Sequence, residues 1–359
     1  MTSPRLQKVY RLLENAGLDG FLFMNRANLR YLCGFTGSSG ALLVTPRETV
    51  FLTDFRYMIQ AHKEVRAQKI VRYRMATEGI VEQVEALGLQ RIGFESETLT
   101  YDQVLHLRSK SSDACQWIAE TSGLHTLRSV KDAEELAAIA GAASLAAAAF
   151  EEVLPLLRPG CREREFAFEL ELAMRRRGAE EKAFDIIVAS GYRGALPHGT
   201  ASDKLIARGD LVTIDFGCRL NGYHSDETVT LAIGTVDPQL RRIYETVLEA
   251  RHRALDGIRP GVALRDIDAL ARDYIVAQGY GDYFGHGLGH GLGLEVHEKP
   301  TISSLSDAVA EENMVFTVEP GIYLPERGGV RIEDLVCVTA EGCRRLTRLP
   351  KDFQILSAA

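Results

Sequence analysis

The spacing of apolar residues alternates between helical and strand periods along the first third of the chain. A helical pattern there is followed by short apolar runs typical of strands, and the alternation then repeats. The expected elements are helix Leu6–Ala16, strands Gly20–Met24, Gly40–Val44 and Val50–Thr53, helix Phe55–Val65, and strand Arg91–Phe94. Alternation of this kind predicts an α/β domain.

A long alanine-rich helix is expected at Ala133–Val153, between a charged stretch and the helix-ending Pro155. Beyond it the pattern changes to helices interspersed with strands that carry polar residues. These elements are helices Glu163–Arg177, Pro238–Ile258 and Leu264–Gln278, and strands Asp185–Ala189, Asp210–Phe216, Tyr223–Ile233, Met314–Glu319 and Arg331–Thr339. This part predicts an α+β domain, and we place the two domains at residues 1–128 and 129–359.

Composition and charge exclude several classes of protein. The length of 359 residues exceeds one ordinary core of ~100–200 residues. With 46% hydrophobic and 25% charged residues and a net charge of -7, the chain offers no broad basic surface, so nucleic acid is not an expected partner. The six cysteines show neither a C-x-x-C pair nor a disulfide framework, which indicates reduced thiols in the cytoplasm. No run approaches the ~18 consecutive apolar residues of a membrane span.

Two aspartates fall on neighbouring strand patterns joined by Asn221-Gly222, a strong hairpin signal. If these two residues form the turn, Gly217 lies opposite Asp226, and Asp215 lies diagonally beside Asp226 on the same face. Two carboxylates on one face repel each other unless they are protonated or neutralised, and a divalent cation is a common solution. The alternative is that both are solvent-facing hairpin residues.

A glycine-rich segment, Phe284–Glu298, carries His286, His290 and His297. Glycine at this density lets the backbone and the imidazoles approach a small ligand closely. A phosphate-binding loop would instead require a lysine and a serine or threonine where the histidines stand. The segment therefore indicates a site for a small ligand other than phosphate.

Two glutamates lie at or within apolar strand patterns. Glu319 ends one pattern and Glu333 lies inside another, and carboxylates in such runs need partners. With a period of two, Arg331 and Glu333 point to the same face, so Arg331 could orient an acidic neighbour. A surface salt bridge is the alternative role for Arg331.

Together these motifs closely resemble the pita-bread metallopeptidases, the clan of methionine aminopeptidase, prolidase and aminopeptidase P. The resemblance rests on the motifs H-G-L-G-H-G-L-G, E-P-G and R-I-E-D, and on the order D, D, H, E, E across about residues 185–335. It implies a pita-bread catalytic domain in which the metal ligands are Asp215, Asp226, His290, Glu319 and Glu333.

The first part of the chain narrows the resemblance. Asn28–Gly40 and Thr53–Tyr57 are similar to the creatinase-type N-terminal domain of prolidases and aminopeptidases P, a domain that methionine aminopeptidases lack.

The second part of the chain departs from the family pattern at two places. Proline-directed members commonly read S-G-x-N before P-H-G, whereas Ser190–Gly199 reads S-G-Y-R-G-A-L-P-H-G, and Thr228–Thr230 reads T-V-T where T-R-T is usual.

The resemblance also implies a chemistry. Two divalent ions about 3.5 Å apart can lower the pKa of a shared water so that hydroxide attacks the peptide bond. Glu319 would pass the proton to the leaving nitrogen. His297 would hydrogen-bond the developing oxyanion, with His198 and His286 near the substrate, although each could instead be a structural histidine. Four carboxylates and one imidazole suit Mn²⁺, with Co²⁺ or Zn²⁺ as alternatives.

The expected activity is that of an Xaa-Pro aminopeptidase acting on proline-containing peptides. Prolidases often carry an arginine after the H-E-x-P motif, and this chain has Thr301 there. The alternative is an Xaa-Pro dipeptidase, or prolidase. A third reading, a metal-free binding protein of the same fold, requires the ligands to have been lost, and they are present. Family members of this size are often homodimers, and a homodimer is expected here.

Overall fold

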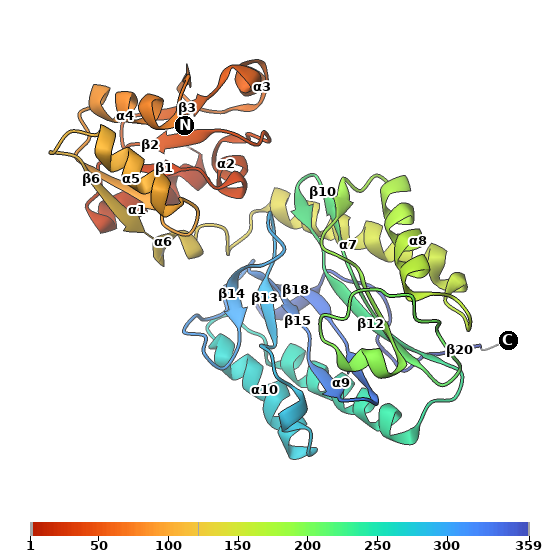
Figure 1. Ribbon diagram of the computed structural model, residues 1–359. Coiled ribbons are helices and arrows are strands. Elements are labelled where there is room, and N and C mark those ends of the chain that lie inside the picture. The colour runs from red at the N-terminus through yellow and green to blue at the C-terminus, as the bar shows by residue number, and fades with distance from the viewer. Residues whose placement is uncertain (1–2, 121, 358–359) are drawn as a thin grey trace. The chain divides into compact units, whose positions relative to one another are not determined.

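The computed structural model describes residues 3–120 and 122–357. The chain forms two compact units, Met1–Arg128 and Ser129–Ala359 (Figure 1). Each unit has its own sheets and its own apolar core.

The first unit is built on a mixed sheet with the strand order β4-β3-β2-β1-β5-β6. Strand β1 is parallel to β5 and antiparallel to β2. All residues of β1, β2 and β3 are buried, so both faces at the centre of the sheet are covered. The strands are β1 (Gly20–Phe23), β2 (Ala41–Val44), β3 (Thr49–Thr53), β4 (Lys69–Arg72), β5 (Arg91–Glu95) and β6 (Gln116–Glu120), and the helices are α1 (Pro4–Ala16), α2 (Arg26–Cys33), α3 (Met58–Glu64), α4 (Ala76–Ala86), α5 (Tyr101–Lys110) and α6 (Ser122–His125). The α/β prediction is confirmed.

The described part of the second unit combines several small sheets with two pairs of helices. The sheets have the orders β11-β10-β7, β20-β12-β9-β8, β14-β13-β15-β18-β19 and β16-β17. The helices are α7 (Ala133–Val153), α8 (Glu163–Arg176), α9 (Pro238–Gly257) and α10 (Leu264–Ala277). The strands are β7 (Glu181–Lys182), β8 (Ile187–Ser190), β9 (Leu211–Phe216), β10 (Cys218–Leu220), β11 (Tyr223–His224), β12 (Glu227–Ile233), β13 (Gly289–Gly291), β14 (Glu298–Ile302), β15 (Val315–Val318), β16 (Gly321–Leu324), β17 (Gly328–Arg331), β18 (Asp334–Thr339), β19 (Gly342–Arg345) and β20 (Ile355–Leu356).

The two helix pairs cover different sheets of the second unit (Figure 1). One apolar cluster joins α7 and α8 to β8, β9 and β12. The other joins α9 and α10 to β15, β16, β17 and β18. The sheets therefore lie between the helix pairs, as the predicted α+β pita-bread domain requires.

Helix α7 begins at a capping box, in which Asp132 and Glu135 each accept the backbone N–H of the other at 3.0 Å. Among the described helices, the stretch Ala133–Leu156 is long and apolar enough to cross a membrane by length and composition alone, with a mean hydropathy of 1.5. Its residues Ala146 and Phe150 are buried in the core of the second unit. A buried core helix meets the same criterion, so the fold accounts for the composition of α7.

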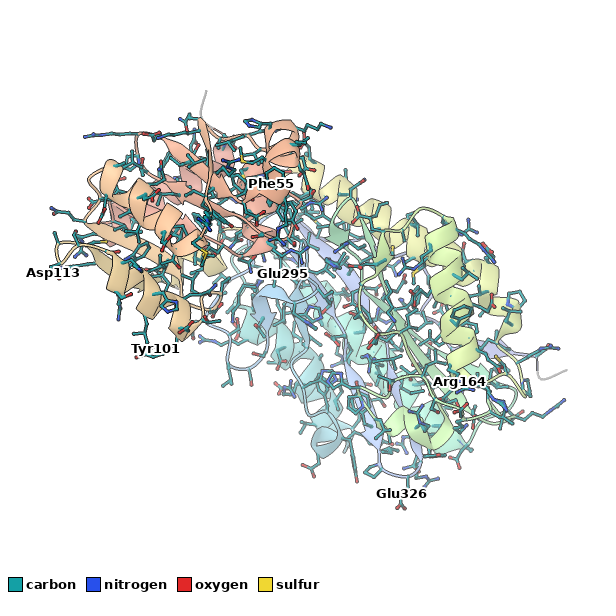
Figure 2. All side chains as sticks on the ribbon, turned by 45° about the horizontal axis from the view of Figure 1, so that its top comes forward. Phe55, Tyr101, Asp113, Arg164, Glu295 and Glu326 are labelled. Carbon is teal, nitrogen blue, oxygen red and sulfur yellow. The ribbon has the colours of Figure 1, made fainter. Side chains whose placement is uncertain are left out.

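Helix α8 is amphipathic. Phe166 and Leu170 are buried in the core, whereas Arg164 projects from the surface of the unit (Figure 2). The first residue of the helix, Glu163, is an exception to this division, because it is charged and fully buried.

Two expected strands are interrupted at a carboxylate. The segment Tyr223–Ile233 forms β11 and β12 with Asp226 between them, and Arg331–Thr339 is divided between β17 and β18 with Glu333 between them. At each interruption the chain passes from one sheet to another. The prediction of continuous strands was wrong here, because an alternating pattern persists across a break when the residues on both sides are buried.

Candidate metal centre

A cavity of about 660 Å³ in the second unit contains all the residues predicted for the site. They are Asp215, Asp226, His290, Glu319, Glu333, His198, His286, His297 and Arg331. Its volume falls within the range of ~300–1,000 Å³ typical of small-molecule sites. The structure thus brings together residues from segments far apart in the sequence.

The predicted hairpin register is present in the structure. Asp215 on β9 pairs with Thr228 on β12, and continuing this register places Gly217 opposite Asp226. The two strands approach so closely here that a Cβ on Gly217 would lie 1.8 Å from the carbonyl oxygen of Ser225. Only glycine fits at this position, and its absence of a side chain lets the two aspartates approach the same cavity.

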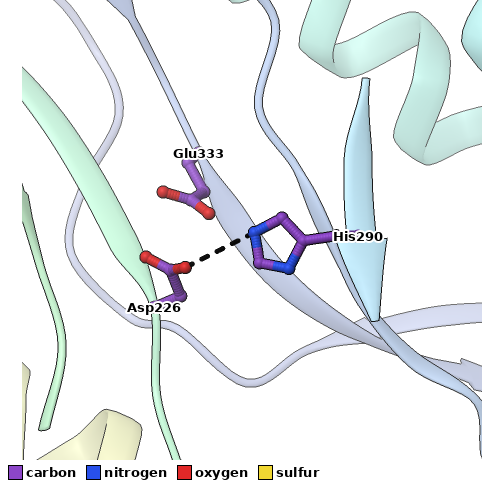
Figure 3. Close-up of side chains that lie close together, drawn as sticks. All are labelled: Asp226, His290 and Glu333. Atoms are coloured by element: carbon purple, nitrogen blue, oxygen red, sulfur yellow. Dashed lines mark ion pairs between the residues drawn. The ribbon is translucent and has the colours of Figure 1, made fainter. Parts of the chain in front are cut away.

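Asp226, His290 and Glu333 converge from three segments (Figure 3). Each offers one ligand atom, and these atoms lie within 4.8 Å of one another. The His290 Nε2 atom is 3.6 Å from the Asp226 carboxylate, while Nδ1 is 3.0 Å from the carbonyl oxygen of Gly291. Because a carbonyl can only accept, Nδ1 carries the hydrogen and Nε2 turns its lone pair toward the carboxylates.

Hydroxyl groups orient the two glutamates. Glu319 accepts a hydrogen bond from the Thr317 hydroxyl at 3.1 Å, and its Oε1 lies 3.5 Å from His290 Nε2. Glu333 accepts a hydrogen bond from the Thr228 hydroxyl at 2.6 Å. These bonds restrict the rotation of both carboxylates and hold them in the cavity wall.

Arg331 fixes Asp215. Its Nη2 donates to Asp215 Oδ2 at 2.6 Å, and its side chain is 4% exposed. Among the described residues, the buried Oδ1 atom of Asp215 has no hydrogen-bond partner. A buried carboxylate oxygen without a partner is costly and calls for an explanation such as an ion.

The electrostatics of the cavity also favour a cation. The pKa values of Asp226 and Glu333 are raised well above their ordinary values. Burial is the larger cause, and repulsion from neighbouring carboxylates is the second. Burial likewise raises the pKa of Glu319, and burial lowers the pKa of His290. The ionised forms of these three carboxyls are therefore destabilised. The neutral His290 imidazole does not offset this, because the lone pair on its Nε2 atom points toward them. A divalent cation would neutralise this group, and the oxygen-rich donor set fits a hard ion.

The three other histidines occupy different surroundings. His286 places Nδ1 2.8 Å from the Gly287 carbonyl, so its Nε2 accepts a hydrogen bond from the Tyr323 hydroxyl at 2.9 Å. The His297 ring lies 4.3 Å from the ring of His290, measured between centroids, and burial lowers its pKa. His198 lines the cavity and is exposed.

Two polar residues of the site were missed in the sequence. Arg331 Nη1 donates to the Tyr323 hydroxyl at 3.1 Å, so Tyr323 links Arg331 to His286. The only sequence signal for Tyr323 was its place in an apolar strand pattern, because a buried tyrosine hydroxyl needs a hydrogen-bond partner. Thr228 was noted as part of a sequence departure, yet its hydroxyl binds Glu333 across 105 positions of sequence. No local pattern predicts a contact of that range.

Comparisons with known proteins agree with these features. Residues 137–340 match metallopeptidase family M24, and residues 5–130 match the creatinase/prolidase N-terminal domain. The chain is 39% identical to the Xaa-Pro dipeptidase of Pyrococcus furiosus, over 97% of this chain and 99% of that protein. A solved Xaa-Pro dipeptidase from Bacillus anthracis has 45% identity and a TM-score of 0.95, covering 98% of this chain and 100% of the other. A solved X-Pro aminopeptidase from Thermotoga maritima has 39% identity and a TM-score of 0.89, covering 98% and 99%.

Proposed function

Because the chain belongs to metallopeptidase family M24, we propose that it is an Xaa-Pro dipeptidase, which hydrolyses the peptide bond before the proline of a dipeptide. The observation that carries the proposal is the buried group of carboxylates that faces His290 Nε2 and leaves Asp215 Oδ1 without a described partner. The end-to-end similarity to Xaa-Pro dipeptidases from Pyrococcus furiosus and Bacillus anthracis supports the substrate class.

In this proposal, five side chains hold the cation site. They are Asp215, Asp226, His290, Glu319 and Glu333, all of which line the cavity. Divalent ions bound there would lower the pKa of a water near the scissile bond and polarise the peptide carbonyl. We propose two ions, with Mn²⁺ preferred and Co²⁺ or Zn²⁺ as alternatives, because four carboxylates and one imidazole form a hard donor set.

The residues around the cation site would act on the substrate. Glu319, whose pKa is raised by burial, would take a proton from the attacking water and pass it to the proline nitrogen. His297 would donate a hydrogen bond to the oxygen that becomes negative during the reaction. His198 and His286 would contact the peptide, and the hydrogen bond from Tyr323 holds the His286 ring in one orientation.

An Xaa-Pro aminopeptidase is the second candidate, and Thr301 favours it. Thr301 lines the cavity where prolidases often carry an arginine. Among the described residues that line the cavity, Arg331 is the only arginine or lysine, and it already pairs with Asp215. The described lining of this cavity thus offers no additional permanent cation for the C-terminal carboxylate of a dipeptide. The similarity to the Thermotoga maritima X-Pro aminopeptidase also supports this candidate.

We further propose that the protein is a homodimer that acts in the cytoplasm. The compartment is supported by the cysteines, since all six are free thiols. A chain that used disulfides for stability would pair at least some of them in an oxidising compartment.

Hydrolysis assays with Mn²⁺ test the proposal directly. An Xaa-Pro dipeptide, an Xaa-Pro-Xaa tripeptide and a longer peptide with proline second would be compared at equal concentration. Cleavage of the dipeptide alone supports the dipeptidase. Efficient cleavage of the longer peptides would replace it with the aminopeptidase. A protein that binds no divalent cation and cleaves none of the peptides would contradict both.

A further inference from the structure

We propose that Glu163 and Arg193 form a clamp that positions His198 at the cavity, which makes Arg193 a positioning residue for the reaction. The clamp acts on the loop 191–201, the segment where the chain departs from the S-G-x-N pattern. The inference rests on the proposed function, because the position of His198 affects catalysis only if a peptide binds in the cavity.

Glu163 holds both ends of this loop. Its carboxylate is fully buried, and its Oε1 accepts the backbone N–H and the hydroxyl of Ser190, each at 2.7 Å. Its Oε2 accepts the backbone N–H and the hydroxyl of Ser202, at 3.1 and 2.6 Å. Ser190 precedes the loop and Ser202 follows it. One carboxylate on α8 therefore fixes the distance between the two ends.

Arg193 adds a connection across the loop itself. Its Nη1 donates to Glu163, and its Nη2 donates to the backbone carbonyl of Thr200 at 2.7 Å. Its side chain is 14% exposed, so this fork is largely shielded from water. The planar guanidinium can satisfy both acceptors at once, which the single ammonium of a lysine does less well.

A second arginine anchors the same loop from the metal side. Arg331 Nη1 donates to the Pro197 carbonyl at 3.1 Å, while Nη2 of the same guanidinium donates to Asp215. The carbonyls of Pro197 and Thr200, which lie on either side of His198, are thus each bound by an arginine. Rotation of the backbone that carries His198 is restricted relative to Asp215.

The loop also lies directly on strand β17. A Cβ on Gly194 would be 2.9 Å from the backbone nitrogen of Gly329, and one on Gly329 would be 2.1 Å from the carbonyl oxygen of Gly194. Removing Arg193 would leave this contact and all four serine hydrogen bonds to Glu163 intact. We therefore expect its loss to release the part of the loop around Thr200 without unfolding the unit.

Hydrogen exchange tests the clamp independently of activity. Arg193→Gln should increase exchange of the amides in residues 191–201 by about 10- to 100-fold, the effect of losing one charge-assisted hydrogen bond. The matched control is Arg164→Gln. Arg164 pairs with Asp203 at 2.8 Å, but these two side chains are 60% and 68% exposed, so the control should leave this exchange unchanged (Figure 2). Equal exchange in the two variants would overturn the clamp.

A double-mutant cycle tests the consequence for His198. With Mn²⁺ and an Xaa-Pro substrate, Arg193→Gln should lower kcat/KM by about 10- to 100-fold, as expected for a misplaced catalytic group. The double variant Arg193→Gln/His198→Ala should be no slower than His198→Ala alone, because both changes remove the same contribution. Bound metal, measured by elemental analysis, should not change.

The outcomes of the cycle are distinct. Losses that multiply in the double variant, or an Arg193→Gln enzyme as active as the unaltered one, would overturn the positioning role. If Arg193→Gln does not fold, Arg193→Lys replaces it and should show the same pattern with a smaller loss. An unaltered protein that cleaves no Xaa-Pro substrate would instead overturn the proposed function, and the exchange experiment would still decide whether the clamp exists.

Discussion

A divalent cation should stabilise the second unit, and the gain should be larger at neutral pH than at acid pH. Burial and then mutual repulsion raise the pKa of the Asp226 and Glu333 carboxyls, and burial raises the pKa of Glu319. In the cation-free protein these groups therefore keep protons at pH values where an unfolded chain has lost them. A bound cation removes the need for those protons.

The sign and size follow from proton linkage. Because the three carboxyls bind more protons in the folded protein than in the unfolded chain, their contribution to cation-free stability is greatest below about pH 4 and falls as the pH rises toward the raised pKa values. An extra proton costs about 1.4 kcal/mol per pH unit while it stays bound, so a proton retained from about pH 5.5 to about pH 7.5 costs about 2.7 kcal/mol. A cation at about 100 times its dissociation constant contributes about 2.7 kcal/mol, or roughly 5–10 °C in Tm for a unit of this size.

Scanning calorimetry of chelator-treated protein, with and without Mn²⁺ at both pH values, measures this gain. Asp226→Asn should remove most of it. Glu245→Gln is the matched control and should keep it, because Glu245 pairs with Arg241 at the surface, where their side chains are 58% and 55% exposed. A gain that is equal at both pH values would refute the reasoning.

Three further predictions follow from the cavity wall and the segments behind it. Thr301→Arg should raise kcat/KM for the dipeptide relative to the tripeptide by about 10- to 100-fold, because it adds a charged donor for the C-terminal carboxylate of the dipeptide. An unchanged ratio of the two kcat/KM values would contradict this. Asp268→Ala should lower the free energy of unfolding by about 3–5 kcal/mol, because the buried carboxylate accepts hydrogen bonds from Arg272 and from the Leu288 N–H. Urea unfolding measures this loss, and a loss below about 1 kcal/mol would argue against it. Gly217→Ala should lower Tm and weaken cation binding, because the added Cβ would collide with the Ser225 carbonyl oxygen and cost about 1–3 kcal/mol or more of unfolding free energy. A variant with unchanged Tm and full metal content would disprove the close approach of the two strands.

Much of the fold was predictable because its signals are local. The long helix Ala133–Val153 has the bounds that the sequence predicted, since a charged stretch precedes the alanine-rich apolar run and Pro155 follows it. The hairpin at Asn221-Gly222 was also predictable, and both residues adopt the positive φ that such turns require, 50° and 78°. The breaks at Asp226 and Glu333 were not, because burial on both sides hides a change of sheet from a periodic pattern.

For the substrate preference, a single position and the similarity over the whole chain favour different activities. Thr301 favoured an aminopeptidase over a dipeptidase, whereas similarity over the whole chain supports the dipeptidase better. One residue reports one possible contact of the substrate carboxylate. Several side chains from different segments together determine how a peptide binds in the cavity.

The sequence by itself determined which side chains to expect in the cavity and on which elements most of them lie, because motifs, turns and periodicity are properties of neighbouring residues. Only the tertiary structure decided which atoms face one another. The lone pair of His290 Nε2 points at carboxylates, Arg331 joins Asp215 to the loop of His198, and one buried glutamate fixes both ends of that loop. These contacts arise from the packing of distant segments, which local sequence patterns do not encode.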